Sequence, residues 1–177
     1  MIRIIVTGAA GRMGRRLVAN IAESGDLKLA GATERPGSEF LGLDAGTVAG
    51  VAPQGVRITD DFAGLVSQAD AVIDFSTGAV IANARLAASK GLSIVIGTTA
   101  LTADDKAELK KLADAGAKIV FASNYSVGVN LLFYLTKLAA QTLSDDFDIE
   151  IIEAHHNQKK DAPSGTAVSL AEVIANV

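Results

Sequence analysis

The feature that most constrains the fold is an alternation of short Val- and Ile-rich runs with longer, amphipathic stretches rich in Ala and Leu. This alternation is typical of β-α-β units. The short runs are continuously apolar, as expected of parallel strands that helices cover on both faces. We therefore predict an α/β fold with a doubly wound parallel sheet. The predicted strands are 2–6, 27–33, 71–75, 92–96 and 118–122, and the predicted helices are 12–24, 79–90 and 102–115, the last with Thr102 as its N-cap.

The stretch 36–55 is rich in glycine and proline, which predicts a long loop or flap. After Ala122 the pattern changes, and 129–143 is apolar on most faces, which predicts a buried helix. Residues 147–154 mostly alternate and predict a strand with one wetter face. Pro163 suits the first turn of a last helix that runs to Ala175. The predicted domains are 1–125 and 126–177, the latter being the start of a second α+β domain.

Composition excludes several classes of function. The chain has no cysteine, which removes disulfides, thiolate metal sites and cysteine nucleophiles. Its net charge of -4 and its lack of a basic run argue against nucleic acid or a membrane surface as the main partner. No apolar run approaches the roughly 20 residues that span a bilayer. We therefore expect a cytoplasmic protein that acts on a small molecule.

The first predicted strand runs directly into a glycine turn, Gly8-Ala9-Ala10-Gly11-Arg12-Met13-Gly14. One glycine permits the tight turn, another lets the backbone approach a pyrophosphate, and the third lets the helix pack on the sheet. Free N–H groups of the new helix then face the phosphates. The alternative is a glycine-rich strand-to-helix turn without a ligand. The sequence context favours a Rossmann-like dinucleotide site.

An acidic residue follows at the expected distance from this turn. Glu34 ends the second strand 20 residues after Gly14, the spacing at which a carboxylate reaches the adenosine ribose hydroxyls. The guanidinium of Arg35 suits the adenine ring or the 2′-phosphate of NADP, although it is equally typical of a solvated surface charge. We therefore expect NADH or NADPH as the cofactor.

Polar turns after three strands are expected to line the cofactor, because ligands of this fold lie beyond the carboxyl ends of the strands. Small and hydroxylated residues there would let a nicotinamide ring approach the backbone. The turns are Phe75-Ser76-Thr77, Gly97-Thr98-Thr99 and Ala122-Ser123-Asn124-Tyr125.

Both histidines of the chain lie in one polar block, 150–167. Adjacent His155 and His156 suggest a metal, but neighbouring side chains of an extended segment point to opposite faces and no cysteine completes a site. A solvated polar loop is a second alternative. The favoured interpretation is acid–base chemistry beside an anion-binding helix end, because imidazole titrates near neutrality.

The start of the last helix is a candidate carboxylate site. Ser164, Gly165 and Thr166 supply hydroxyls, free N–H groups and the positive end of the helix dipole. Asp161 is a candidate N-cap. Lys159 or Lys160 would hold a second carboxylate, so the spacing favours a dicarboxylic acid.

At this point the sequence resembles the dihydrodipicolinate reductase family of the diaminopimelate route to lysine. The resemblance covers essentially the whole chain in order and is densest in the block 150–167. It also rests on the glycine turn, Glu34-Arg35, Gly97-Thr98-Thr99 and Asn124-Tyr125-Ser126-Val127-Gly128.

The resemblance implies a role for individual residues. His155 would donate and accept the proton and Lys159 would be a second proton donor. Substrate contacts would be His156, Gly165 and Thr166. The cofactor would be held by Gly8, Ala9, Ala10, Gly11, Arg12 and Met13, with Glu34 and Arg35 at its adenosine end and Gly97, Thr98, Thr99, Ala122, Ser123, Asn124 and Tyr125 at its nicotinamide end.

The implied reaction reduces 4-hydroxy-tetrahydrodipicolinate to tetrahydrodipicolinate with hydride from NADH or NADPH. Chains of this family are longer, and their later strands build the substrate domain and the homotetramer interface. A non-catalytic NAD(P)-binding fragment or sensor is therefore an alternative. Another nicotinamide-dependent reductase of an amino-acid precursor is a weaker one.

Overall fold

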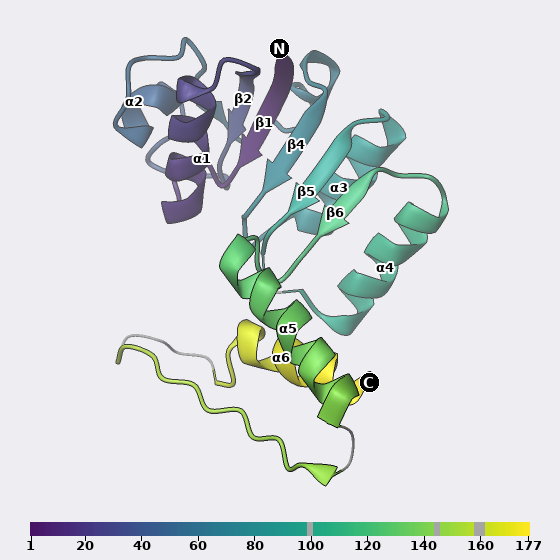
Figure 1. The fold of residues 1–177 in the computed structure, drawn as a ribbon. Helices are drawn as coiled ribbons and strands as arrows, with labels where there is room; N and C mark the ends of the chain where they lie inside the picture. The colour runs from purple at the N-terminus through teal and green to yellow at the C-terminus, as the bar shows by residue number, and fades with distance from the viewer. Residues whose placement is uncertain (99–100, 144–145, 158–161) are drawn as a thin grey trace. The chain divides into compact units, whose positions relative to one another are not determined.

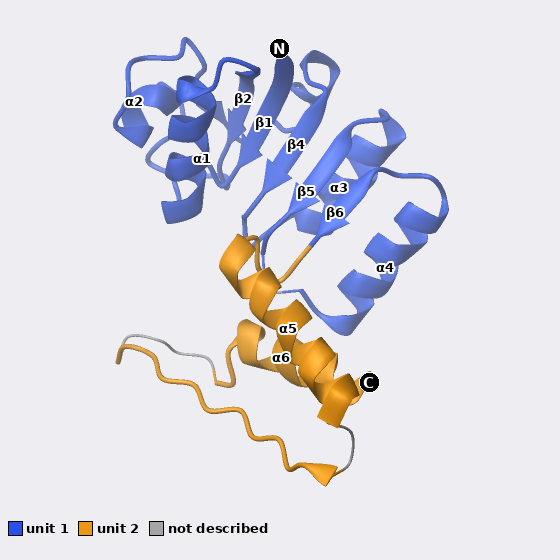
Figure 2. Cartoon of the chain, viewed as in Figure 1, with its two compact units in different colours: residues 1–121 blue, residues 122–177 orange. Residues whose placement is uncertain are grey.

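The computed structural model of the chain describes residues 1–98, 101–143, 146–157 and 162–177. The chain forms two compact units, residues 1–121 and 122–177 (Figure 2). The division thus falls after Phe121, whereas the sequence predicted it after Tyr125.

The first unit is built on a parallel sheet of six strands in the order β3-β2-β1-β4-β5-β6 (Figure 1). The chain starts in the middle of the sheet and winds outward in both directions, which confirms the predicted doubly wound, Rossmann-like fold. The strands are β1 Ile2–Thr7, β2 Leu27–Thr33, β3 Ile58–Thr59, β4 Ala71–Asp74, β5 Ser93–Ile96 and β6 Ile119–Phe121.

Helices cover both faces of this sheet, as the apolar runs predict. Successive side chains of β1 point to opposite faces of the sheet. Ile4 and Val6 pack with α1 (Arg12–Glu23) on one face, and Ile5 packs with α3 (Val80–Ser89) and α4 (Ala103–Asp114) on the other. A capping box between Thr102 and Asp105 begins α4, which confirms the predicted N-cap. The helices are α1 Arg12–Glu23, α2 Ala45–Ala49, α3 Val80–Ser89 and α4 Ala103–Asp114, with a 3₁₀ turn, η1, at Val66–Gln68.

Two short elements of this unit differ from the sequence prediction. The stretch 36–55, predicted as a loop, contains α2, because the Asp44 carboxylate accepts the N–H of Thr47 at 3.0 Å and caps a single turn. Gly50, at φ 81°, ends that turn. The second element, β3, was not predicted, since its two residues are too short to show a period.

The second unit contains two helices that pack on each other, α5 Val127–Leu143 and α6 Gly165–Ala175. Both helices were predicted, but the buried environment of the first was wrong. Ala140 is the buried residue of α5, whereas Tyr134 is 65% exposed, because a unit this small cannot surround a helix. No helix among the described residues has the length and apolarity needed to cross a membrane.

The strand predicted at 147–154 does not form. These residues run as an extended segment (Figure 1) with no strand assignment, because the described part of this unit offers them no partner strand. Pro163 precedes α6 rather than lying in its first turn, and Ser164 is the N-cap.

Candidate cofactor and substrate sites

The glycine turn after β1 disfavours side chains at two positions, Gly8 because of its backbone conformation and Gly14 because of its close neighbours. Gly8 has a left-handed backbone, with φ 65°. A Cβ on Gly14 would lie 2.0 Å from the Gly8 carbonyl oxygen and 2.7 Å from the Ala9 Cα. The third glycine was predicted to let the helix pack on the sheet, and the atoms that a side chain would meet here belong to the turn itself.

The peptide groups around Ala10 are held from two sides. Glu34 Oε1 accepts the Ala10 N–H at 2.9 Å, and Arg15 Nε donates to the Ala10 carbonyl at 2.7 Å. The Arg15 guanidinium also lies over the Phe40 ring, 5.0 Å from its centroid. Sequence reasoning did not single out Arg15 or Phe40, since their partners are backbone and a distant loop.

A cavity of about 470 Å³ opens at the carboxyl ends of the strands beside this turn. It brings together four of the predicted cofactor residues, namely Gly8, Gly11, Glu34 and Arg35. Phe75, Ser76 and Thr77, predicted to follow a strand toward the ligand, line it as well. Of the other predicted residues, Ala9 is buried, Ala10 is half-buried, and Arg12 and Met13 are exposed.

Asp74, which was not predicted as a site residue, holds one of the residues that line this cavity, Ser76. It is buried at the end of β4, and its Oδ1 accepts both the N–H and the hydroxyl of Ser76, at 2.8 and 2.7 Å. Ser76 in turn lies next to Gly8, because a Cβ added to Gly8 would lie 3.3 Å from the Ser76 Cβ. Asp74 therefore fixes the residue against which the glycine turn packs.

The turn after β5 is packed equally tightly. A Cβ on Gly97 would lie 2.0 Å from Phe75 Cζ, so the ring occupies the space of a side chain. Thr98 is buried and lines a second cavity of about 340 Å³ together with Thr77 and Leu101. Thr99 lies outside the described residues.

In the second unit, the predicted turn 122–125 contacts α6. Ser123 Oγ lies 2.8 Å from Ser169 Oγ, and Asn124 Nδ2 donates to Thr166 Oγ1 at 3.3 Å. Partial burial raises the pKa of the Tyr125 phenol above its ordinary value. The turn thus holds Thr166, a predicted substrate contact.

The N-terminus of α6 already holds a carboxylate of the protein. Glu153 Oε1 accepts the Ser164 N–H at 2.8 Å, and Oε2 accepts the Ser164 hydroxyl. Ser164 Oγ in turn accepts the Ala167 N–H at 3.1 Å as the N-cap of the helix. Both hydrogen-bond donors of Ser164, which was predicted to bind substrate, are therefore engaged by Glu153.

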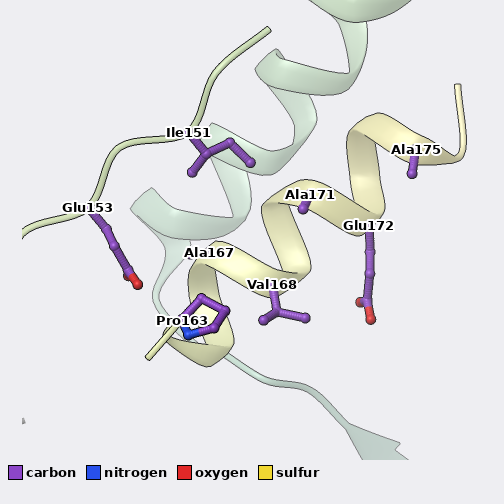
Figure 3. Close-up of a pocket in the computed structure, with 8 residues that line it drawn as sticks. All are labelled: Ile151, Glu153, Pro163, Ala167, Val168, Ala171, Glu172 and Ala175. Carbon is purple, nitrogen blue, oxygen red and sulfur yellow. The ribbon is translucent and has the colours of Figure 1, made fainter. Parts of the chain in front are cut away.

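His155 lies next to the same carboxylate. Its Nδ1 is 3.6 Å from Glu153 Oε2, and both side chains are partly exposed. Figure 3 shows Glu153 reaching from the extended segment toward the Pro163 end of α6, at the border of an apolar groove of about 450 Å³. Sequence reasoning placed Glu153 only on a wet strand face. Glu153 lies two residues before His155, and this spacing, which places both side chains on the same side of an extended segment, was the available signal.

Two further predictions concern Lys159 and a metal site. Lys159, with its neighbours Lys160 and Asp161, lies outside the described residues. Within the described part of the chain no three His, Asp or Glu side chains gather as a metal site would require.

Comparison with known proteins places the chain in a family. The family profile for the dihydrodipicolinate reductase N-terminus matches residues 2–125, and the profile for the C-terminus matches residues 128–177. The chain is 51% identical over 176 residues to 4-hydroxy-tetrahydrodipicolinate reductase of Anaeromyxobacter sp. (strain Fw109-5), covering 99% of this chain and 65% of the relative. It is 50% identical over 174 residues to the enzyme of that name from Rhodopseudomonas palustris (strain HaA2), covering 98% and 64%.

A solved structure agrees with the sequence relatives. The dipicolinate-bound dihydrodipicolinate reductase from Paenisporosarcina sp. TG-14 has a TM-score of 0.77 and 30% identity, covering 100% of this chain and 66% of that one. The chain thus spans about two thirds of the length of these relatives. On the profile matches and the curated relatives, the chain belongs to the dihydrodipicolinate reductase family.

Proposed function

We propose that the protein reduces 4-hydroxy-tetrahydrodipicolinate to tetrahydrodipicolinate, after loss of water, in lysine biosynthesis in the cytoplasm. The observation that carries the proposal is the polar block 150–167, in which a candidate proton donor, His155, lies beside a helix N-terminus suited to a carboxylate. Relatives of this name at about half identity support it. For the longer family form we propose a homotetramer.

The cavity of the first unit suits a nicotinamide dinucleotide. Gly14 permits the close approach of α1 to the turn, and the N-cap Gly11 offers no side chain to the first-turn amides, which leaves them for a diphosphate. Bound NADH or NADPH would supply hydride to one carbon of the conjugated imine. Glu34 and Arg35 would hold its adenosine end, and Gly97 to Thr99 together with 122–125 its nicotinamide end.

Residues of the second unit would donate protons to the substrate and bind its carboxylates. His155 would deliver a proton where negative charge develops after hydride arrives, with Lys159 as a second donor. His156, Ser164, Gly165 and Thr166 would hold carboxylate oxygens. For Ser164 this requires the substrate to share or displace Glu153, so Gly165 and Thr166 are the stronger candidates.

The proposal is tested by calorimetric titration of pyridine-2,6-dicarboxylate, a planar analogue of the substrate, into protein saturated with NADH. We expect binding that Lys159→Ala weakens by at least about tenfold, since a charged hydrogen bond is worth about 1.5–3 kcal/mol. Lys137→Ala, an exposed lysine of α5, is the matched control. NADH binding without any response to the dicarboxylate would instead support an NAD(P)-binding fragment or sensor.

The choice between NADH and NADPH depends on Glu34 in this proposal. Its carboxylate lines the cavity while accepting the Ala10 N–H, and a free ribose diol would be preferred over a 2′-phosphate beside that charge. Glu34→Gln keeps an acceptor for Ala10 but removes the charge. We expect the ratio of NADPH to NADH affinity to rise by about tenfold, and an unchanged ratio would reject the role.

A further inference from the structure

We infer that Glu153 is a positioning residue that joins the two halves of the substrate site, the proton donor His155 and the carboxylate-binding end of α6. The inference rests on the proposed function and assigns a task to a carboxylate that the reaction itself does not use. Glu153 need not touch the substrate, because it acts through His155 and Ser164.

The Glu153 carboxylate is anchored at the start of α6. Both of its oxygens accept hydrogen bonds from Ser164, one from the backbone N–H at 2.8 Å and one from the hydroxyl. Ser164 is buried, 6% exposed, and caps α6 through the Ala167 N–H. A carboxylate in this place also interacts favourably with the helix dipole. Glu153 therefore sets where the first turn of α6, with Gly165 and Thr166, begins.

His155 lies on the same side of the extended segment as Glu153, because side chains two residues apart in such a segment point to the same side. The distance of 3.6 Å between Glu153 Oε2 and His155 Nδ1 is too long for a hydrogen bond but short enough for the carboxylate to attract a proton on Nδ1. A carboxylate on the Nδ1 side favours a proton on that nitrogen and leaves Nε2 to exchange protons with a substrate.

Other charged groups of this unit define the surroundings. Glu172 of α6 lines the same groove as Glu153 (Figure 3). Among the described residues Glu153 is the carboxylate within ion-pair distance of His155. We therefore assign the link to the Glu153 side chain, and two variants test its two arms.

Glu153→Gln tests mainly the arm toward His155. The amide oxygen still accepts the Ser164 N–H, so the backbone anchor remains, whereas the amide nitrogen in the place of Oε2 no longer accepts the Ser164 hydroxyl. That nitrogen donates toward Nδ1 and favours a proton on Nε2. The chain has two histidines, so ¹⁵N shifts of the neutral imidazoles identify each tautomer directly. We expect the tautomer ratio of His155 to change about twofold to fivefold, with His156 unchanged. Glu150→Gln, an exposed carboxylate of the same segment, is the control.

Glu153→Ala removes both arms. We expect amide hydrogen exchange of Ser164 and of the first turn of α6 to accelerate by about fivefold, as for loss of a helix cap, together with the tautomer change. Protein whose exchange and tautomer ratio both match the wild type would overturn the inference. A response of only one arm would overturn the claim that Glu153 joins the two halves. If the alanine variant does not fold, the His155 tautomer ratio and the amide exchange of Ser164 are measured in Glu153→Gln instead.

Ligand titration separates this inference from the proposed function. In NADH-loaded protein, Glu153→Ala should weaken pyridine-2,6-dicarboxylate binding by about tenfold and leave NADH affinity unchanged. Unchanged dicarboxylate affinity would overturn the positioning role. Wild-type protein that binds no dicarboxylate would overturn the proposed function instead, while the exchange and tautomer measurements on the free protein would still decide what Glu153 holds.

Discussion

The Arg15 guanidinium on α1 donates to the Ala10 carbonyl at 2.7 Å, and this hydrogen bond fixes the glycine turn from the side of the helix. The opposite side of the same residue is held by Glu34, which accepts the Ala10 N–H. Because Phe40 lies under the guanidinium, the bond also ties the loop after β2 to the turn. The shape of the candidate phosphate site thus depends on side chains outside the glycine motif.

Replacement of Arg15 by Met should weaken NADH binding by about tenfold, because it frees the Ala10 carbonyl and removes a charged hydrogen bond. Arg16→Met removes the same charge from an exposed neighbour on α1 and is the matched control. Fluorescence titration with NADH measures both. Equal losses in the two variants would mean that net charge, rather than the bond to Ala10, matters.

Gly14→Ala should lower the free energy of unfolding by about 2 kcal/mol. The new methyl group would meet backbone atoms of Gly8 and Ala9, which cannot rotate away as a side chain can. The usual gain of alanine over glycine inside a helix, about 1 kcal/mol, offsets only part of this. Gly25→Ala, where nothing lies within 4 Å, should change stability by less than about 0.5 kcal/mol in the same urea titration.

Gly97 and Phe75 should show strong coupling in a double-mutant cycle. Gly97→Ala alone forces the Phe75 ring to move and should cost about 1–3 kcal/mol of unfolding free energy. In the background of Phe75→Ala the same substitution should cost at least about 1 kcal/mol less. Gly78→Ala, in open space, is the control. Additive effects would contradict the contact.

Asp74→Ala should both destabilise the protein by about 2 kcal/mol and weaken NADH binding, because Ser76 loses two hydrogen bonds and no longer fixes Gly8. Asp74→Asn keeps an acceptor for Ser76 and should restore most of the affinity. NADH titration and urea unfolding measure the two effects. Loss of affinity in the asparagine variant as large as in the alanine variant would show that the charge is the active feature.

Asp70 should contribute to stability in a way that depends on pH. Hydrogen bonds from Arg3 lower the pKa of its carboxyl to about 2. Its contribution is therefore full above the unfolded pKa, about 3.9, and is lost as pH falls toward the folded value. The stability deficit of Asp70→Asn should be largest near neutral pH and shrink below about pH 4. Urea unfolding of the wild type and of Asp70→Asn across this pH range measures the trend, and a deficit that does not change with pH would contradict it.

Much of the first unit was predictable because its signals are local. The strand 27–33 is matched residue for residue by β2, and the Thr102 cap begins α4. The lone turn α2 and the two-residue strand β3 were missed, since neither is long enough to establish a period.

The second unit was less predictable because its environment is not local. Residues 147–154 alternate as a strand does, but a strand exists only where a partner supplies hydrogen bonds. The apolar faces of α5 likewise indicate that the helix favours burial, but they do not indicate which element would cover it. For the site, the predicted cofactor residues Gly8, Gly11, Glu34 and Arg35 line one cavity. By contrast, Asp74, Arg15 and Glu153 bond to backbone or neighbouring side chains and leave no motif in the sequence.

The order of the strands also determines when the sheet can be completed as the chain is synthesised. β1 lies between β2 and β4, and its register partners Ile4 and Ala71 are 67 residues apart in the chain. Until β4 has left the ribosome, the first strand therefore has one edge without hydrogen-bond partners and one apolar face only partly covered. Closing so long a loop is slow compared with forming a helix. We therefore expect the nascent chain to be prone to aggregation in this interval, before the strand that carries Asp74 is made.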